Sequence, residues 1–185
     1  MNDTNTVTLS GLLHHLSQKK GNSYFPFSIK HENLWTDGTT RRDFLTARAF
    51  NNEVQEKLRG LPENAPIKVK GVLRSSKGSG ELYLDVCEVE NLGEEFTLEN
   101  QVKLSGYVHI IKAQAEGETG TGKYVRFAVR QESPEGKDFL VVRVYDDELR
   151  EIFTRKNSDD PVEVEGTLRS SKGSGVNYVR CTKLL

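Results

Sequence analysis

The sequence predicts an all-β protein made of two tandem five-stranded barrels, with one short helix in each. Three observations predict it. The octapeptide "LRSSKGSG" stands at residues 73–80 and again at 168–175. Most segments around each octapeptide alternate apolar and polar residues with the period of a β-strand. Each half of the chain also has one short segment whose apolar residues recur at helical spacing.

The repeat extends well beyond the octapeptide, because the same offset of 95 residues pairs Gly71 with Gly166. Identical segments at this offset are "LSG" at 9–11 and 104–106, and "DFL" at 43–45 and 138–140. One segment departs, since "YFPFSIKHE" from Tyr24 matches "YVRFAVRQE" from Tyr124 at an offset of 100. The length changes fall in stretches rich in Gly, Thr and polar residues, which we expect to be surface loops.

Five segments of the first copy have the alternation and the β-branched and aromatic residues of strands. In chain order they are "TVTLSGLLHHL", "SYFPFSIKHE", "DFLTARAF", "IKVKGVLR" and "ELYLDVCEV". The first and fourth contain Gly11 and Gly71, with counterparts Gly106 and Gly166 in the second copy. A glycine inside a strand commonly marks a bulge or a sharp bend of a barrel.

A short helix is expected between the third and fourth strands of each copy. In the first copy Val54, Leu58 and Leu61 share one helical face, and Asn51 or Asn52 caps the helix. The second copy offers Asp146 or Asp147 as the cap, and the same spacing predicts burial of Leu149, Ile152 and Phe153. The resulting element order is that of the OB-fold, a partly open five-stranded barrel. We place the two OB-folds at residues 1–97 and 98–185.

Composition restricts the function. The net charge is −1, so any binding of nucleic acid depends on local charge separation. The two cysteines form neither a disulfide framework nor a zinc pattern. The polar first ten residues lack the apolar core of a signal peptide, and no stretch approaches the roughly 20 apolar residues of a membrane helix. We therefore expect a cytoplasmic protein that does not bind membranes.

One face of each third strand is small and aliphatic, and the other carries aromatic rings around an arginine. The face with the aromatic rings consists of Phe44, Thr46, Arg48 and Phe50 in the first copy, and of Phe139, Val141, Arg143 and Tyr145 in the second. The neighbouring strands add Tyr24, Ser28 and Lys30, and Tyr124, Arg126, Ala128 and Arg130. Such faces suit single-stranded nucleic acid, because bases stack on rings while cations hold phosphates. The alternative is that these faces are buried against a partner subunit.

Each octapeptide follows a fourth strand, in the loop that flanks the binding groove of an OB-fold. Its cations are Arg74 and Lys77 in the first copy, and Arg169 and Lys172 in the second. With two serines and flexible glycines it is predicted to be a phosphate-gripping arm; the alternative is a tight hairpin with solvated cations. The last three candidate binding residues are Trp35 in the longer loop, and Tyr83 and Tyr178 on the fifth strands.

Several of these motifs resemble the bacterial single-stranded-DNA-binding protein (SSB) family and its relative, primosomal replication protein n. They are "FLTARAF" and "FLVVRVY" with the helix that follows each, "IKVKGVLR" and "VEVEGTLR", and the tyrosines after each octapeptide. Phe44 and Phe139 stand where the family has Trp. The resemblance implies sequence-tolerant binding of single-stranded DNA in replication, recombination or repair, and a homodimer with four barrels. The family's acidic-Pro-Phe tip is not found at "CTKLL", so recruitment of replication proteins by that tip is not expected.

An enzyme is not expected. His14 and His15 are assigned no counterparts in the second copy, Cys87 and Cys181 are not equivalent, and no carboxylate cluster repeats at metal-ligand spacing. No cofactor and no metal are therefore expected. Two other binding functions stay open: an adaptor that binds proteins of a replication or primosome complex, and a binder of single-stranded RNA, since OB-folds serve both purposes.

Overall fold

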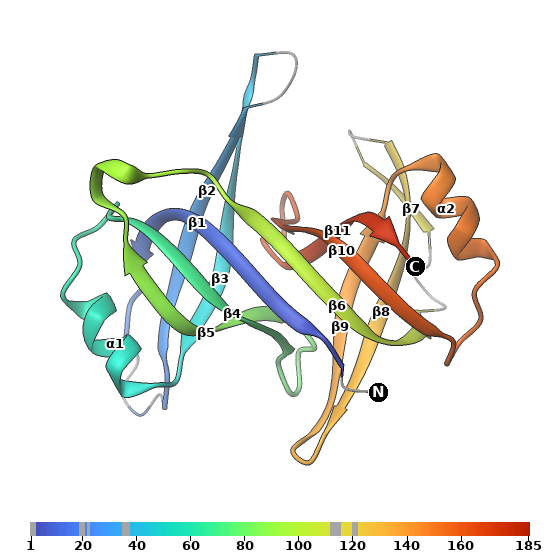
Figure 1. Cartoon of the computed structure of the whole chain (residues 1–185), viewed down its shortest axis with the longest axis horizontal. Coiled ribbons are helices and arrows are strands. Elements are labelled where there is room, and N and C mark those ends of the chain that lie inside the picture. Colours follow the sequence, from blue (N-terminus) through green and yellow to red (C-terminus); the bar gives the residue numbers. More distant parts are fainter. Residues whose placement is uncertain (1–2, 19–20, 22, 35–37, 112–115, 120–121) are drawn as a thin grey trace.

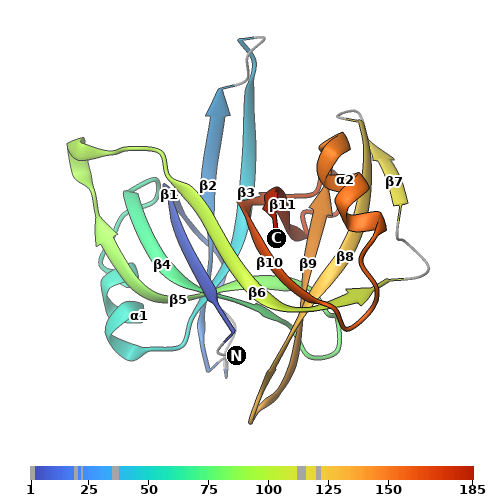
Figure 2. The same ribbon diagram turned by 45° about the vertical axis from the view of Figure 1, so that its right-hand side comes forward.

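The computed structural model describes residues 3–18, 21, 23–34, 38–111, 116–119 and 122–185. Its elements are, in chain order, β1 (Asn5–His15), β2 (Phe25–Leu34), β3 (Thr40–Ala49), α1 (Asn52–Arg59), β4 (Pro66–Ser75), β5 (Leu82–Asn91), a 3₁₀ turn (Gly93–Glu95), β6 (Asn100–Ile110), β7 (Glu116–Thr119), β8 (Gly122–Ser133), β9 (Gly136–Val144), α2 (Asp147–Thr154), β10 (Pro161–Ser170) and β11 (Asn177–Leu184). Two barrels lie side by side, with β1 and β6 at the centre and the two helices on opposite outer sides (Figure 1, Figure 2). The element order confirms two tandem OB-folds.

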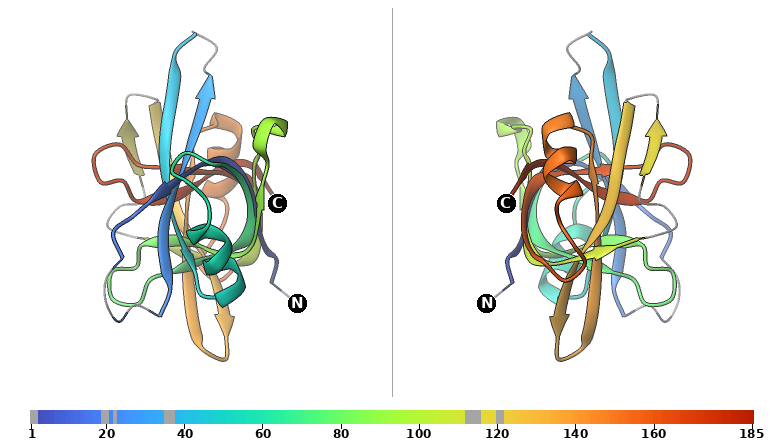
Figure 3. Two further views of the ribbon diagram at one scale, coloured as in Figure 1. Left: turned by 90° about the vertical axis from the view of Figure 1, so that its left-hand side faces the viewer. Right: turned by 90° about the vertical axis from the view of Figure 1, so that its right-hand side faces the viewer.

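The strands of both barrels form one continuous sheet, in the order β2-β3-β5-β4-β1-β6-β10-β11-β9-β8-β7. Additional pairing of β1 with β2 closes the first barrel, and pairing of β6 with β8 closes the second. The barrels join where β1 runs antiparallel to β6, and again where Leu82 of β5 meets Asn177 of β11. Seen along the long axis, each barrel has its helix in front, α1 in one view and α2 in the other (Figure 3).

Two details differ from the sequence prediction. The loop expected in the second copy contains the short strand β7, which pairs antiparallel with β8. Ile152 of α2, predicted to be buried, is 42% exposed, whereas Phe153 is 8% exposed and stacks on Phe127. The division at residue 97 falls between β5 and β6 and stays a prediction, because β1 and β6 pair directly across it.

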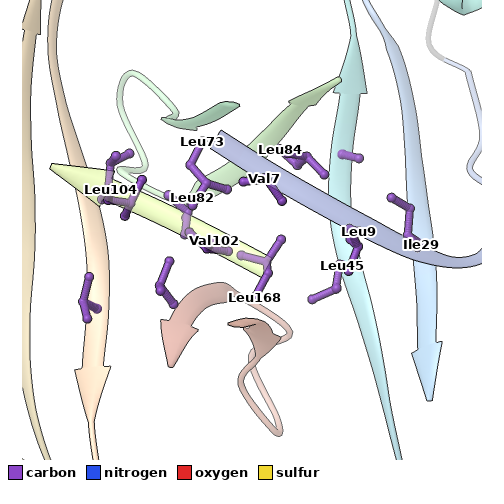
Figure 4. Close-up of a cluster of buried hydrophobic side chains, with 14 of the residues drawn as sticks. Val7, Leu9, Ile29, Leu45, Leu73, Leu82, Leu84, Val102, Leu104 and Leu168 are labelled. Atoms are coloured by element: carbon purple, nitrogen blue, oxygen red, sulfur yellow. The ribbon is translucent and has the colours of Figure 1, made fainter. Parts of the chain in front are cut away.

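The core runs without interruption from one barrel into the other. Buried side chains from β1 and β6, such as Val7, Leu9, Val102 and Leu104, form one cluster with residues of both barrels (Figure 4). Leu73 and Leu168, the first residues of the two octapeptides, are both 0% exposed within it. The central strands therefore bury apolar surface shared by both repeats, which favours a fixed arrangement of the barrels.

Gly71 and Gly166 lie at matching bulges, where the pairing of β4 with β5 and of β10 with β11 shifts. A Cβ on either glycine would lie 2.1 Å from a carbonyl oxygen of the neighbouring strand. Only glycine fits so close an approach of two backbones, which confirms the expected role of these residues. Both helices also have the expected caps, since the side chains of Asn51 and Asp146 accept backbone N–H bonds.

Candidate nucleic-acid interface

The third strands present the two faces that the alternation predicted. In β3, Leu45, Ala47 and Ala49 are fully buried, while Phe44 and Phe50 point outward and are 44% and 40% exposed. In β9, Leu140, Val142 and Val144 are likewise buried, and the outward residues are partly exposed. Both barrels therefore carry their aromatic and arginine residues on the outer face of the sheet.

In barrel one, Arg48 lies against two tyrosine rings. Its Cζ is 4.6 Å from the ring centroid of Tyr24 and 4.1 Å from that of Tyr83. Phe50 completes the group, with its ring centroid 5.3 Å from Tyr24 and 6.5 Å from Tyr83. We call these four residues the barrel-one cluster.

Barrel two has the matching arrangement around Arg143. Its Cζ is 4.7 Å from the ring centroid of Tyr124 and 4.1 Å from that of Tyr178, and the rings of Tyr124 and Tyr145 are 5.2 Å apart. A second arginine, Arg180 on β11, lies 4.6 Å from the Tyr145 ring. These five residues form the barrel-two cluster, which has one more cation than the barrel-one cluster.

Two of the predicted stacking residues lie beneath arginines. Tyr83 is 9% exposed and Tyr178 is 3% exposed. Burial raises the pKa of both phenols, against the opposing effect of Arg48 on Tyr83. Tyr83 and Tyr178, both predicted to bind nucleic acid, therefore have little ring surface open to a base. They support arginine side chains from below, and a guanidinium plane can itself stack on a base.

The remaining predicted cations on these faces lie along β2 and β8. Lys30 is opposite Phe44, Arg130 is opposite Phe139, and Arg126 is opposite Arg143. Arg130 pairs with Asp159, and the Asp159 carboxylate raises the pKa of the Arg130 guanidinium.

The two clusters border two hollows that share part of their lining, which we together call the groove. A hollow of about 160 Å³ is lined by Arg48 and Tyr83, and one of about 330 Å³ by Arg126, Arg143 and Tyr178. Both hollows are also lined by Glu81, Leu82, Ser174, Val176 and Asn177. Since β5 meets β11 at Leu82 and Asn177, the groove crosses from one barrel to the other at that contact.

The octapeptides do more than form loops, because the first residues of each one contact the opposite barrel. Arg169 of barrel two is 8% exposed, and its Nε lies 3.2 Å from Oδ2 of Asp43 in barrel one. The backbone N–H and the hydroxyl of Ser170 both donate to Oδ1 of Asp43 at 3.0 Å. Arg41 adds an ion pair to Asp43 at 3.5 Å. Burial lowers the pKa of the Arg169 guanidinium, and the Asp43 carboxylate opposes that change.

The octapeptide of barrel one makes the corresponding contact with barrel two. Arg74 of barrel one lies 3.4 Å from Oδ2 of Asp138 in barrel two, and the N–H and hydroxyl of Ser75 donate to Oδ1 of Asp138 at 2.9 and 3.3 Å. Arg74 also pairs with Asp85 at 3.4 Å, and its side chain is 37% exposed. We call the two Asp–Arg–Ser contacts the inter-barrel clamps.

The clamps explain why an Arg and a Ser stand at fixed places in both octapeptides. They also contradict the prediction that Arg169 grips phosphate, because its side chain is buried against Asp43. Arg74 lines a hollow of about 330 Å³ with Arg48 and Lys77, so it stays a candidate contact. Lys77 and Lys172 are exposed, and Lys77 Nζ donates to the carbonyl of Glu135 at 3.3 Å.

Solved structures of one protein match this architecture along the whole chain. The wild-type single-stranded DNA binding protein from Thermus aquaticus matches with a TM-score of 0.76 and 18% sequence identity, covering 100% of this chain and 93% of that one. Its R190A deletion mutant matches with a TM-score of 0.72 and 19% identity, covering 99% and 94%. This chain shares the fold of the Thermus aquaticus protein. The resemblance read from the sequence is thereby confirmed for the fold. No protein-family model and no curated protein sequence matches the chain.

Some residues of the interface were not found from the sequence. Arg180 has Asp85 as its counterpart at the 95-residue offset, so the repeat gave no reason to select it. Asn177 exchanges two hydrogen bonds with the backbone of Thr46 in the other barrel, at 3.0 and 3.2 Å. Trp35, a predicted binding residue, lies outside the described residues.

The part of the chain that the structure describes lacks two other kinds of feature. No group of three or more His, Cys, Asp or Glu residues there is arranged to hold a metal ion. Within the same residues, no helix has the length and apolar character needed to span a membrane.

Proposed function

We propose that this protein binds single-stranded DNA, with tolerance for sequence, in the groove that crosses both barrels. The main support is the same arginine-on-tyrosine cluster in each barrel, beside two hollows that share five lining residues. Arginine offers both a charge for phosphate and a flat surface for bases, and the exposed ring of Phe50 and the half-buried ring of Tyr145 extend that surface. Neither contact reads base identity, which is why tolerance is expected.

The likeness to single-stranded DNA binding proteins supports the same proposal. Such a protein serves replication, recombination or repair by holding unpaired strands, and it needs no catalytic group. Because the net charge is −1, the attraction to DNA is local. The salt dependence of binding should therefore reflect only the cations of the groove.

The decisive experiment is a fluorescence titration with oligo-dT, oligo-rU and duplex DNA, each at two salt concentrations. Tight binding of oligo-dT and poor binding of duplex are expected, because a duplex hides the base faces. Equal binding of duplex and single strand would overturn the proposal. Preference for oligo-rU would favour an RNA binder, and no binding of any of the three would favour a protein adaptor.

We also propose that two copies pair as a homodimer with four barrels. Support comes from the outer face of the six strands β5, β4, β1, β6, β10 and β11, which are neighbours in the sheet. The four strands outside the central pair β1 and β6 carry outward charges on this face. They are Glu88 and Glu90 on β5, Lys68 and Lys70 on β4, Glu163 and Glu165 on β10, and Lys183 on β11. At the 95-residue offset, three of these positions have opposite charges in the two barrels: Lys68 and Glu163, Lys70 and Glu165, and Glu88 and Lys183; Glu90 corresponds to Leu185.

This charge reversal makes the face complementary to itself. If two faces stack about a two-fold axis parallel to the strands, β4 lies over β10 and β5 over β11. Lys70 of one copy then lies within two residues, along the strand direction, of Glu165 of the other copy. An in-plane axis perpendicular to the strands would place like charges together instead. Like-charge contact disfavours that pairing. Light scattering that finds only the 20.8 kDa species at working concentration would contradict the homodimer.

A further inference from the structure

Each barrel has a histidine against the outermost phenylalanine of its groove face. His14 on β1 meets Phe44 with ring centroids 5.7 Å apart at 70°, and His109 on β6 meets Phe139 at 4.8 Å and 61°. The two histidines are 95 residues apart and occupy matching positions, with Leu13 opposite Ile29 and Val108 opposite Val129. The expectation that His14 has no counterpart was therefore wrong: its counterpart is His109.

The two histidines differ in their partner. His14 Nδ1 lies 2.7 Å from Oε1 of Glu63, in the loop between α1 and β4. The matching loop of barrel two has the same backbone path, since Asn64 donates to the Leu13 carbonyl and Asp159 to the Val108 carbonyl, both at 2.8 Å. The residue before Asp159 is Ser158, so barrel two has a serine where barrel one has the carboxylate.

The charged groups around His109 are mostly cationic. Opposite it on β8 is Ala128, flanked on the same face by Arg126 and Arg130. From the loop after α2, the Asp159 carboxylate is held by Arg130, and the Asp160 carboxylate accepts from the Asn157 N–H at 2.7 Å. Asp138, the residue before Phe139 in β9, contacts Ser75 and Arg74. On β6 itself, Tyr107 lies under the Arg130 guanidinium, 5.4 Å from its Cζ.

We propose that His109 and Phe139 form a nucleotide-binding position at the outer end of the barrel-two groove. The Phe139 ring stacks on a base, and the protonated imidazole contacts the phosphate beside it. A bound phosphate adds a negative charge beside an imidazole whose neighbours on β8 are Arg126 and Arg130. DNA binding is therefore coupled to uptake of a proton in barrel two. In barrel one, the Glu63 carboxylate already occupies the corresponding place beside His14. This inference rests on the proposed binding of single-stranded DNA.

The test measures affinity for oligo-dT without a terminal phosphate, because thymine does not titrate in the range used. Histidine ordinarily changes charge between about pH 5 and pH 8. Affinity should rise about two- to fivefold between pH 8 and pH 5.5, the range set by one solvent-exposed ion pair. His109→Gln should remove that rise, while His14→Gln should keep it. If both variants lose the rise in affinity equally, or if His109→Gln keeps it, the inference is overturned.

A third variant tests the cause from the opposite direction. Ser158→Glu places a carboxylate where barrel one has Glu63, and should flatten the pH dependence while His109 is still present. An unchanged pH dependence in Ser158→Glu would contradict the role given to the local charge. If the unmodified protein fails to bind oligo-dT at either pH, the proposed function itself has failed, which is a different result. Thermal melting of each variant shows that the fold is kept.

Discussion

The inter-barrel clamps make a sharp prediction about stability, because their two aspartates differ in burial. The side chain of Asp43 is 1% exposed, and that of its partner Arg169 is 10% exposed. Asp138 is 17% exposed, and its partner Arg74 is 37% exposed. Asp43→Asn and Asp138→Asn are therefore matched variants, equal in chemistry and unequal in environment.

Asp43→Asn removes the charge that faces a buried guanidinium. Breaking a buried pair by removing one partner costs about 3–5 kcal/mol of the free energy of unfolding, since the other charge is left uncompensated. Arg74 has water and Asp85 as alternatives, so Asp138→Asn should cost about 1 kcal/mol, as exposed pairs do. Urea unfolding measures both. Equal losses in the two variants, or a larger loss in Asp138→Asn, would refute the reasoning from burial.

Two further predictions concern the clusters and the thiols. The matched double variants are Arg143→Ala with Tyr145→Ala in barrel two, and Arg48→Ala with Phe50→Ala in barrel one. Each should weaken oligo-dT binding by about 1–3 kcal/mol for the lost ring. The loss should be larger in barrel two, where the rest of the groove is more basic. A larger loss in barrel one would show that the number of arginines is not decisive. Burial raises the pKa of the Cys181 thiol to about 11, so a thiol reagent at about pH 8 should modify Cys87 alone until urea is added, and rapid modification of both thiols in the folded protein would contradict this burial.

Much of the fold could be predicted because most of its strands and helices depend on local sequence patterns. Alternation with period two located the strands, the apolar spacing located both helices, and the repeat confirmed each element by showing it twice. The bulge glycines were found for the same reason, since Gly71 and Gly166 interrupt otherwise regular strands. Ile152 was misplaced because apolar spacing marks a helix face but not which of its residues are covered, and in the eight-residue α2 only Phe153 is buried.

The clamps could not be predicted, although both of their parts were visible as repeated letters. Asp43 and Ser170 are 127 positions apart, and each lies in a segment that makes sense inside its own barrel. A repeat shows which residues are equivalent, but it does not show that one copy contacts the other. The stacking of Arg48 and Arg143 on buried tyrosines was missed for a related reason, since alternation assigns a face but not which side chain covers another.

The charge reversal between the barrels gives the homodimer its own test. Lys68→Glu with Lys70→Glu would set glutamates against glutamates in the stacked faces, losing the two Lys70–Glu165 pairs per dimer at roughly 0.2–1 kcal/mol each. The dimer should weaken by about 0.4–2 kcal/mol and sedimentation should shift toward the 20.8 kDa species. Adding Glu163→Lys and Glu165→Lys to the same chain restores opposite charges and should restore the dimer. Lys68 also pairs with Glu99 within the chain, so thermal melting must show that each variant is folded. A folded Lys-to-Glu variant that stays dimeric, or a fourfold variant that stays monomeric, would mean that this face does not join the two copies.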